Sequence, residues 1–557
     1  MPLLRYLAAF SGRLLSRAFD RATLDSCRTQ EQLLLTLVRN NRDTAFGRDH
    51  GFATVRSVAD YRRQVPLQDY DSLWPYIERA THGEPNVLTS EPPFMFATTS
   101  GTTGDPKFIP VTTAFERASS AIGRLWLYRA QRDHPDLFSR KILSVVSPAV
   151  EGYTQGAIPY GSASGHIYRQ MGRLVRSSYA IPYRVFGITD YDAKYYVIMR
   201  VAMEQSISFL ATPNPSTIIK LVETGNDRKE DIIRDIRDGT LSGKFEVPKA
   251  VRERVSQLFP SNPRRARELE RFAQDHGALR PRDYWPDLRL IGCWTGGTVG
   301  IYVKKLGQWF GPDMAIRDLG YLSTEARASL PIEDGRAPGV IAVNANFYEF
   351  IPTDEIENEH PQVLPCDELE EGREYYVVLT TPGGLYRYDI NDILKVTGFY
   401  NTAPLVEFVQ KGRDMTSLTG EKLHVSQVVS AIDDATGSLP VRLAGYQALA
   451  DVETSRYHLM VEFEGEPPDG TVLRDFVRQV DDRLCSLNLE YEAKRKSGRL
   501  APPCLNVMKR GWHEHARKTL IGKGIRDSQL KTRVLAYFQG ARDTSEVLYT
   551  LDPLDPG

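Results

Sequence analysis

The sequence has almost no net charge and no long apolar run. Its 557 residues hold 70 Lys and Arg against 71 Asp and Glu, which gives a formal net charge of -1. Proteins that bind nucleic acid or a membrane surface usually carry a basic field, so we expect no nucleic-acid partner. No apolar stretch reaches the roughly 18–20 residues that cross a bilayer, and we expect no integral membrane association.

Cysteine pairs and metal-binding motifs are also missing. The five cysteines form no CxxC motif and stand far apart, at positions 27, 293, 366, 485 and 504. This spacing excludes a disulfide scaffold and a zinc site built from cysteines, and it suits a reducing, cytoplasmic environment. The segment His513-Glu514-His515 does not have the spacing of the zinc-binding motif HExxH.

The sequence does contain an alternation of apolar runs and helical patterns. Strands are expected at 142–147, 207–211, 288–294, 314–319, 340–344, 375–380 and 393–399. Helices are expected at 113–131, 191–205, 215–223, 249–259 and 263–276. This alternation predicts an α/β fold with layered sheets and helices. Residues 1–23 mix arginine with leucine and phenylalanine, which predicts an amphipathic helix packed on the domain, with surface or membrane attachment as the alternative.

A change of pattern near residues 411–414 predicts a domain boundary. The chain before it is rich in predicted strands. After it come a helix at 425–435, strands at 441–450 and 457–464, and a helix at 471–486. We therefore expect a large N-terminal domain, residues 1–412, and a smaller α/β C-terminal domain, residues 413–557.

The strongest local signal is the segment TTSGTTGDPK, residues 98–107, which follows an apolar stretch. Its glycines let backbone N–H groups face a ligand, its threonines and serine add hydroxyl donors, and Lys107 adds a cation. Such a loop would hold a polyanion, for example a triphosphate. It is not the Walker A motif GxxxxGK[ST], and a solvated surface turn is the alternative.

A second polar segment is DLGYLSTE, residues 318–325, directly after a predicted strand. In α/β sheets, ligands collect outside the carboxyl ends of the strands. Glu325 could hold Mg²⁺, which takes one or two carboxylates together with phosphate oxygens, and Tyr321 could stack on a base. The alternative is a helix N-terminus capped by Ser323 or Thr324.

A third segment is LYRYDINDILKV, residues 385–396. A carboxylate placed between two strands can accept hydrogen bonds from both hydroxyls of a ribose. The alternative is a β-hairpin in which Asn391 and Asp392 form the turn.

The predicted boundary itself contains Gly412-Arg413-Asp414. A hinge at these residues would let the C-terminal domain carry a lysine, Lys422 or Lys531, into and out of a phosphate site. The alternative for either lysine is a solvated surface side chain.

In this order, the segments resemble the acyl-adenylate-forming superfamily, and more closely the Gretchen Hagen (auxin-responsive) acyl-acid amido synthetases. The resemblance is carried by TTSGTTGDPKFIPVT, GYLSTEA, FYEFIP and LYRYDINDILKVTGF, and it covers most of the chain. It implies a large adenylate-forming domain followed by a smaller, mobile one. Two positions depart from the third motif of that family, because Asn391 replaces a glycine and Asp389 replaces an arginine.

The resemblance implies a role for each matching residue. At the phosphates we expect Thr98, Thr99, Ser100, Gly101, Thr102, Thr103 and Lys107. Tyr321 would meet the adenine, Thr324 the α-phosphate and Glu325 the metal ion. Phe347 would lie near the base and Asp392 would bind the ribose.

Two lysines are the candidate catalytic residues of the C-terminal domain. Lys422 would approach the phosphates after the hinge moves. Lys531 resembles the C-terminal lysine of the family, but the proline expected after Lys531-Thr532 is absent. The residues that line the site of the acid are expected between positions 124 and 164, and Arg124 and Tyr160 are the candidates.

The resemblance implies that ATP and Mg²⁺ are used to convert a small carboxylic acid into its acyl-adenylate. The acyl group would then pass to the amine of an amino acid or to another amine, with release of AMP and pyrophosphate. One alternative transfers the acyl group to a thiol such as coenzyme A. The other is a nucleotide-binding homologue without catalysis.

Overall fold

The computed structural model describes residues 2–99, 107–296, 301–513, 534–538 and 545–553. The chain folds into two compact units, each of which makes most of its contacts within itself. The chain passes from the first unit to the second between Val409 and Gln410. Both units combine helices with β-sheets, so the predicted α/β class is confirmed.

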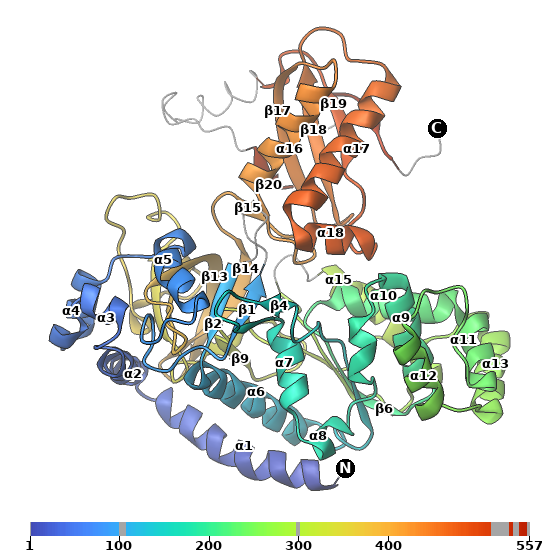
Figure 1. Ribbon diagram of the computed structural model, residues 1–557, viewed down its shortest axis with the longest axis horizontal. Helices are drawn as coiled ribbons and strands as arrows, with labels where there is room; N and C mark the ends of the chain where they lie inside the picture. Colours follow the sequence, from blue (N-terminus) through green and yellow to red (C-terminus); the bar gives the residue numbers. More distant parts are fainter. Residues whose placement is uncertain (1, 100–106, 297–300, 514–533, 539–544, 554–557) are drawn as a thin grey trace. The chain divides into compact units, whose positions relative to one another are not determined.

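The first unit begins with a long helix that packs on another helix. The helix α1 (Pro2–Ala22) runs beside α6 (Thr113–Asp133) (Figure 1). Their backbones approach closely at Gly12, where an added Cβ would lie 2.2 Å from the Cβ of Tyr128. The predicted N-terminal helix and its packing on the domain are therefore confirmed. Shorter helices follow: α2 (Ser26–Asn40), α3 (Ala45–Asp49), α4 (Val58–Gln64) and α5 (Tyr70–Thr81).

A parallel sheet of four strands forms one core of the first unit. Its order is β3-β6-β7-β8, and it consists of β3 (Lys141–Ser144), β6 (Ile207–Ala211), β7 (Leu290–Gly292) and β8 (Ile316–Arg317). Each of these strands lies within or overlaps a strand that was predicted from the sequence. The helices between them include α9 (Tyr191–Ala202), α10 (Pro215–Asp227), α11 (Lys229–Asp238), α12 (Lys249–Leu258), α13 (Pro263–His276) and α15 (Ile301–Phe310).

A second sheet carries the predicted phosphate loop. Strand β1 (Met95–Thr99) pairs antiparallel with β2 (Lys107–Val111), and Thr99 lies opposite Lys107. The sheet is completed by β5 (Pro159–Gly161) and β4 (Gly152–Tyr153) in the order β2-β1-β5-β4. The two ends of the segment 100–106 are thus fixed side by side, whereas that segment itself lies outside the described residues.

An antiparallel sheet of six strands completes the first unit. Its order is β11-β12-β13-β14-β10-β9. The strands are β9 (Ser329–Pro331), β10 (Gly339–Ile341), β11 (Phe347–Pro352), β12 (Glu374–Thr380), β13 (Tyr388–Tyr400) and β14 (Ala403–Lys411). Strand β13 is continuous across Asn391 and Asp392, so the alternative of a hairpin turn at these residues is wrong.

The strand β13 has a bulge at these residues. Tyr376 of β12 pairs with Ile393, and Val378 pairs with Asp389. Val377 alone therefore lies opposite three residues of β13. Asn391 has a φ of +59°, in the left-handed region that asparagine tolerates better than most residues. A bulge of this kind bends a strand and redirects its side chains.

A buried carboxylate joins this sheet to the N-terminal helices. Glu349 on β11 is fully buried and accepts hydrogen bonds from Arg62 at 2.8 Å and Arg387 at 2.9 Å. Arg387 also donates to the carbonyl oxygen of Val65 at 2.8 Å. A carboxylate can be buried at this depth because both neighbouring guanidinium groups compensate its charge.

The second unit is built on a five-stranded sheet. Its order is β20-β17-β18-β19-β21, with β17 (Leu443–Asp451), β18 (Arg456–Phe463), β19 (Cys504–Met508), β20 (Leu535–Tyr537) and β21 (Val547–Leu551). The helices α16 (Val425–Ser438), α17 (Gly470–Leu487) and α18 (Leu489–Lys496) contribute to the same apolar core. A two-stranded hairpin, β15 (Met415–Thr416) and β16 (Leu423–His424), precedes α16.

Candidate active site

The segment after β8 forms a tight turn that presents the predicted acidic residue. Gly320 has a φ of +85°, and an added Cβ there would lie 2.4 Å from the carbonyl oxygen of Ser329. The hydroxyl of Ser323 accepts the backbone N–H groups of residues 325 and 326, each at 3.2 Å, and Leu322 bridges to Arg327. The segment is thus a turn between short bridges, and the alternative of a helix N-terminus is wrong.

Asp318 fixes the base of this turn. Its carboxylate accepts the backbone N–H groups of Gly320 and Thr295, both at 2.6 Å. Burial raises the pKa of Asp318 to about 6, against the opposing effect of these hydrogen bonds. The side chain therefore holds the turn and the end of β7 together.

Two predicted nucleotide-binding residues contact each other directly. The hydroxyl of Tyr321 donates a hydrogen bond of 2.6 Å to Asp392, and both side chains are buried. Burial and the charge of Asp392 raise the pKa of the Tyr321 hydroxyl well above its usual value, so it remains a donor. The ring of Tyr321 stacks on Phe408 of β14, with centroids 6.1 Å apart.

The carboxylate of Glu325 belongs to the same neighbourhood. Burial is the largest cause of the raised pKa of Tyr388, and the negative charge of Glu325 is the second largest. The same charge also raises the pKa of Tyr70 and Tyr321. The charge of Asp392 raises the pKa of Tyr388 as well. The bulge of β13 and the turn after β8 thus bring Glu325 and Asp392 to one cluster of tyrosines.

The hairpin of β1 and β2, which flanks the predicted phosphate loop, reaches this cluster through Tyr70 on α5. The Nζ of Lys107 lies over the ring of Tyr70, 4.9 Å from its centroid, and the backbone N–H of Phe108 donates to the Tyr70 hydroxyl at 2.8 Å. The structure therefore brings Lys107, Glu325 and Asp392 together around Tyr70 and Tyr388. Sequence reasoning missed both tyrosines, since a tyrosine in a helix or strand carries no signal of its own.

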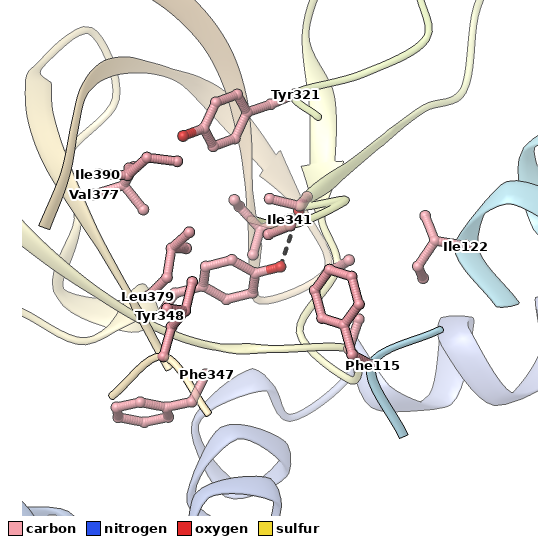
Figure 2. Close-up of a cluster of buried hydrophobic side chains, with 14 of the residues drawn as sticks. Phe115, Ile122, Tyr321, Ile341, Phe347, Tyr348, Val377, Leu379 and Ile390 are labelled. Carbon is pink, nitrogen blue, oxygen red and sulfur yellow. Dashed lines mark hydrogen bonds between the residues drawn. The ribbon is translucent and has the colours of Figure 1, made fainter. Parts of the chain in front are cut away.

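Phe347 does not share this neighbourhood. It is buried against Tyr61 of α4, with ring centroids 6.3 Å apart. The next residue, Tyr348, contributes to the raised pKa of Tyr321, and its ring points away from that of Phe347 (Figure 2). Since successive residues of a strand face opposite sides of the sheet, Tyr348 rather than Phe347 has its side chain on the side of Tyr321.

The remaining candidates of the first unit lie around the hairpin and α6. Thr98 donates to Glu151 at 3.0 Å, and Tyr160 packs edge-on against Phe108. Thr324 is partly exposed in the turn, and Arg124 is exposed on α6. The side chain of Thr99 and all of Ser100, Gly101, Thr102 and Thr103 lie outside the described residues.

A cavity of about 360 Å³ lies between α6 and α7 (Ala163–Gln170). Its lining residues are Thr113, Glu116, Arg117, Ser120, Ile167, Gln170 and Met171. Arg124 follows one helical turn after Ser120 and donates to its carbonyl oxygen at 3.4 Å. No residue between 124 and 164 lines this open cavity, so the lining predicted for the acid site stays a prediction.

In the second unit, Lys422 is held by a rigid frame. The buried carboxylate of Glu421 accepts the backbone N–H groups of Leu418 and Thr419 at 2.6 and 2.7 Å, and the hydroxyl of Tyr457 at 2.5 Å. Asn488 donates to the carbonyl oxygens of Glu421 and Lys422 at 2.9 and 3.3 Å. The backbone around Lys422 is thereby fixed, whereas Lys531 lies outside the described residues.

Neither metal clusters nor membrane-spanning helices occur in the described part of the chain. Its residues contain no group of three or more histidine, cysteine, aspartate and glutamate side chains that could hold a metal ion. No helix within the same ranges is both long enough and apolar enough to cross a membrane. The five cysteines, all within these ranges, form no disulfide bond.

Curated proteins of similar sequence cover nearly the whole chain. The chain is 24% identical to the indole-3-acetic acid-amido synthetase GH3.10 of Arabidopsis thaliana, over 92% of this chain and 93% of that protein. It is also 24% identical to the jasmonoyl–L-amino acid synthetase GH3.5 of Oryza sativa subsp. japonica, over the same shares of both chains.

Solved structures show the same fold. The AtGH3.15 acyl acid amido synthetase in complex with 2,4-DB superimposes with a TM-score of 0.65 at 20% identity, over 97% of both chains. A 2-hydroxyisobutyryl-CoA ligase in complex with 2-HIB-AMP and CoA gives a TM-score of 0.52 at 14% identity, over 93% of this chain and 90% of that one.

Family models account for most of the sequence. The GH3 family N-terminal domain matches residues 15–314, the GH3 family central domain residues 339–411, and the GH3 family C-terminal domain residues 424–539. The resemblance inferred from the four motifs is thereby confirmed, and the chain belongs to the GH3 family.

Proposed function

We propose that this protein is an ATP-dependent acyl-acid amido synthetase. It activates a small carboxylic acid as the acyl-adenylate and transfers the acyl group to the amine of an amino acid or another amine. The observation that carries this proposal is the convergence of Lys107, Glu325 and Asp392 in a chain that belongs to the GH3 family. The unpaired spacing of the cysteines favours the cytoplasm as its location.

The first unit would bind the nucleotide. Asp392 is oriented by Tyr321 and would accept hydrogen bonds from the ribose hydroxyls. Tyr348, whose side chain is on the side of Tyr321, would lie near the base in place of Phe347. Lys107, Thr98 and the loop between them would donate to the phosphates. Thr324 lies beside Glu325 in the turn and would donate to the α-phosphate.

Glu325 is the residue that would hold Mg²⁺. Mg²⁺ needs only one or two carboxylates when phosphate oxygens and water complete its octahedron, so the single buried carboxylate of Glu325, which acts on the same Tyr70 that Lys107 contacts, fits this ion. When bound, the ion would neutralise charge on the phosphates. The chain's own contribution is to keep Glu325 fixed through the Ser323 hydroxyl and the Asp318 carboxylate.

The C-terminal part, residues 413–557, would act as a mobile domain on the adenylation domain, residues 1–412. Lys422 would carry its charge to the phosphates during adenylation, and rotation at residues 412–414 would remove it for amide formation. Support comes from the rigid frame of Glu421 and Asn488 and from a φ of +57° at Asp414. Lys531 remains a second candidate lysine.

Exchange of labelled pyrophosphate into ATP, dependent on an added acid, tests the first step. A panel of carboxylic acids should reveal at least one that supports exchange. Binding of ATP without any exchange would favour the nucleotide-binding homologue that lacks catalysis. The second step is tested by supplying amino acids, other amines and coenzyme A in parallel, because the structural likeness to a CoA ligase makes a thiol the alternative acceptor.

A further inference from the structure

Arg327 has no counter-ion among the residues that the structure describes. It follows the turn that presents Glu325, and its backbone bridges to Leu322. Within the ranges that the structure describes, no hydrogen bond or ion pair involves its guanidinium group.

The most deeply buried arginines of the described ranges are all compensated. Each of the five buried arginines in the described ranges forms an ion pair with a carboxylate: Arg129, Arg200, Arg317, Arg387 and Arg456. A guanidinium group removed from water is costly unless its charge and its donors are satisfied. Arg327 is only partly buried, so its donors remain accessible to a ligand.

The chain leaves room for this side chain on α6. An added Cβ at Gly123 would lie 2.4 Å from Nη1 of Arg327, so the guanidinium group occupies the place of a side chain on that helix. Ser120, three residues earlier on the same face, lines the cavity between α6 and α7. A molecule in that cavity would thus lie about one helical turn from the position that Arg327 occupies.

We propose that Arg327 binds a carboxylate of the acid substrate. This inference rests on the proposed function and deepens it, because it assigns the cation that selects the acid. Arginine suits this task, since its planar group can donate two parallel hydrogen bonds to one carboxylate. The carboxylate has two possible sources, either the group that attacks ATP or a second carboxylate of a dicarboxylic acid.

The test compares Arg327→Gln and Arg327→Lys with the native chain. The control is Arg336→Gln, which removes an exposed arginine paired with Glu333 at the surface. Each protein is titrated by calorimetry with a monocarboxylic acid and with the dicarboxylic acid of the same chain length, without ATP. The same acids are then compared by KM and kcat in pyrophosphate exchange.

We expect Arg327→Gln to weaken acid binding about tenfold or more, with a smaller loss for Arg327→Lys and none for the control. KM for the acid should rise by the same factor, while KM for ATP stays within about twofold. Equal losses for both acids identify the reacting carboxylate, and a loss confined to the dicarboxylic acid identifies the second one. Unchanged acid binding in Arg327→Gln, or an equal rise in KM for ATP, would overturn the proposal.

A second variant checks the geometry independently. Gly123→Ala adds one methyl group where Nη1 of Arg327 now lies, so it should displace the guanidinium group and weaken acid binding while the protein still folds. Native acid binding in Gly123→Ala would also contradict the inference. The binding data on these variants test the role of Arg327 and not the proposed function. The proposed function is contradicted by a different result, in which the native protein binds acids but supports pyrophosphate exchange with none of them.

Discussion

At the scale of single residues, the hydrogen bond between Tyr321 and Asp392 shows how the candidate site is organised. Its two partners are 71 residues apart in the sequence. Their chemical types and positions were predicted from the motifs, but their direct contact was not. A contact between residues so far apart in the sequence depends on how the sheets place β13 and the turn after β8. The spacing of the motifs along the chain does not reveal this placement.

Asp392→Asn should slow adenylation by roughly tenfold to a hundredfold, because a charged acceptor typically contributes about 1.5–3 kcal/mol. Acid-dependent pyrophosphate exchange measures the effect. The control is Glu368→Gln, which changes an exposed carboxylate in the same unit. Native exchange rates in Asp392→Asn would remove this residue from the site.

Asp318 should make stability depend on pH in an unusual direction. Its pKa is raised to about 6 in the folded protein, against an ordinary value of 3.8, so the folded state holds the proton more firmly. Its contribution to stability is therefore largest at low pH and declines as the pH rises between about 4 and 6. Asp318→Asn should remove this decline.

Urea unfolding of both proteins at several pH values between 4 and 7 measures the contribution of Asp318. The quantity to compare is the difference in unfolding free energy between the variant and the native protein, since other carboxylates affect both equally. A difference that does not change with pH would contradict the raised pKa.

At the scale of secondary structure, long regular elements were predicted best. The strand 207–211 and the helix 263–276 have the predicted bounds, because their apolar patterns are regular and their ends carry turn or proline signals. The first half of β13 was missed, since Asn391 and Asp392 are typical turn residues. Their bulge depends on pairing with β12, which local sequence does not reveal.

Asn391→Val should strain this bulge. Valine is disfavoured at a φ of +59°, so we expect a loss of about 1–3 kcal/mol in stability, together with weaker ATP binding as Asp392 shifts. Asn391→Gly should be tolerated, because glycine adopts this conformation readily. Thermal unfolding and ATP titration of both variants check this. Equal stability of the two variants would show that the backbone angle at 391 is unimportant.

At the scale of the whole molecule, the predicted boundary at residue 412 leads to a separate test. A chain that ends at residue 412 keeps Lys107, Glu325 and Asp392 but lacks Lys422. We expect it to fold and to bind ATP within about threefold of the native affinity, while pyrophosphate exchange falls by at least about tenfold. Calorimetric unfolding and exchange assays measure both. A shortened chain with native exchange would exclude a catalytic role for the C-terminal part.

The buried carboxylate of Glu349 has a consequence for how this protein can vary. Because Arg62 reaches it from α4 and Arg387 reaches it from the segment before β13, the N-terminal helices supply part of the charge that the sheet requires. A shortened form that starts after residue 64 would leave Glu349 with half of its compensation. Exchange of the helices at the start of the chain for helices without an arginine at position 62 should therefore destabilise the sheet, whereas helices that carry this arginine should be accepted.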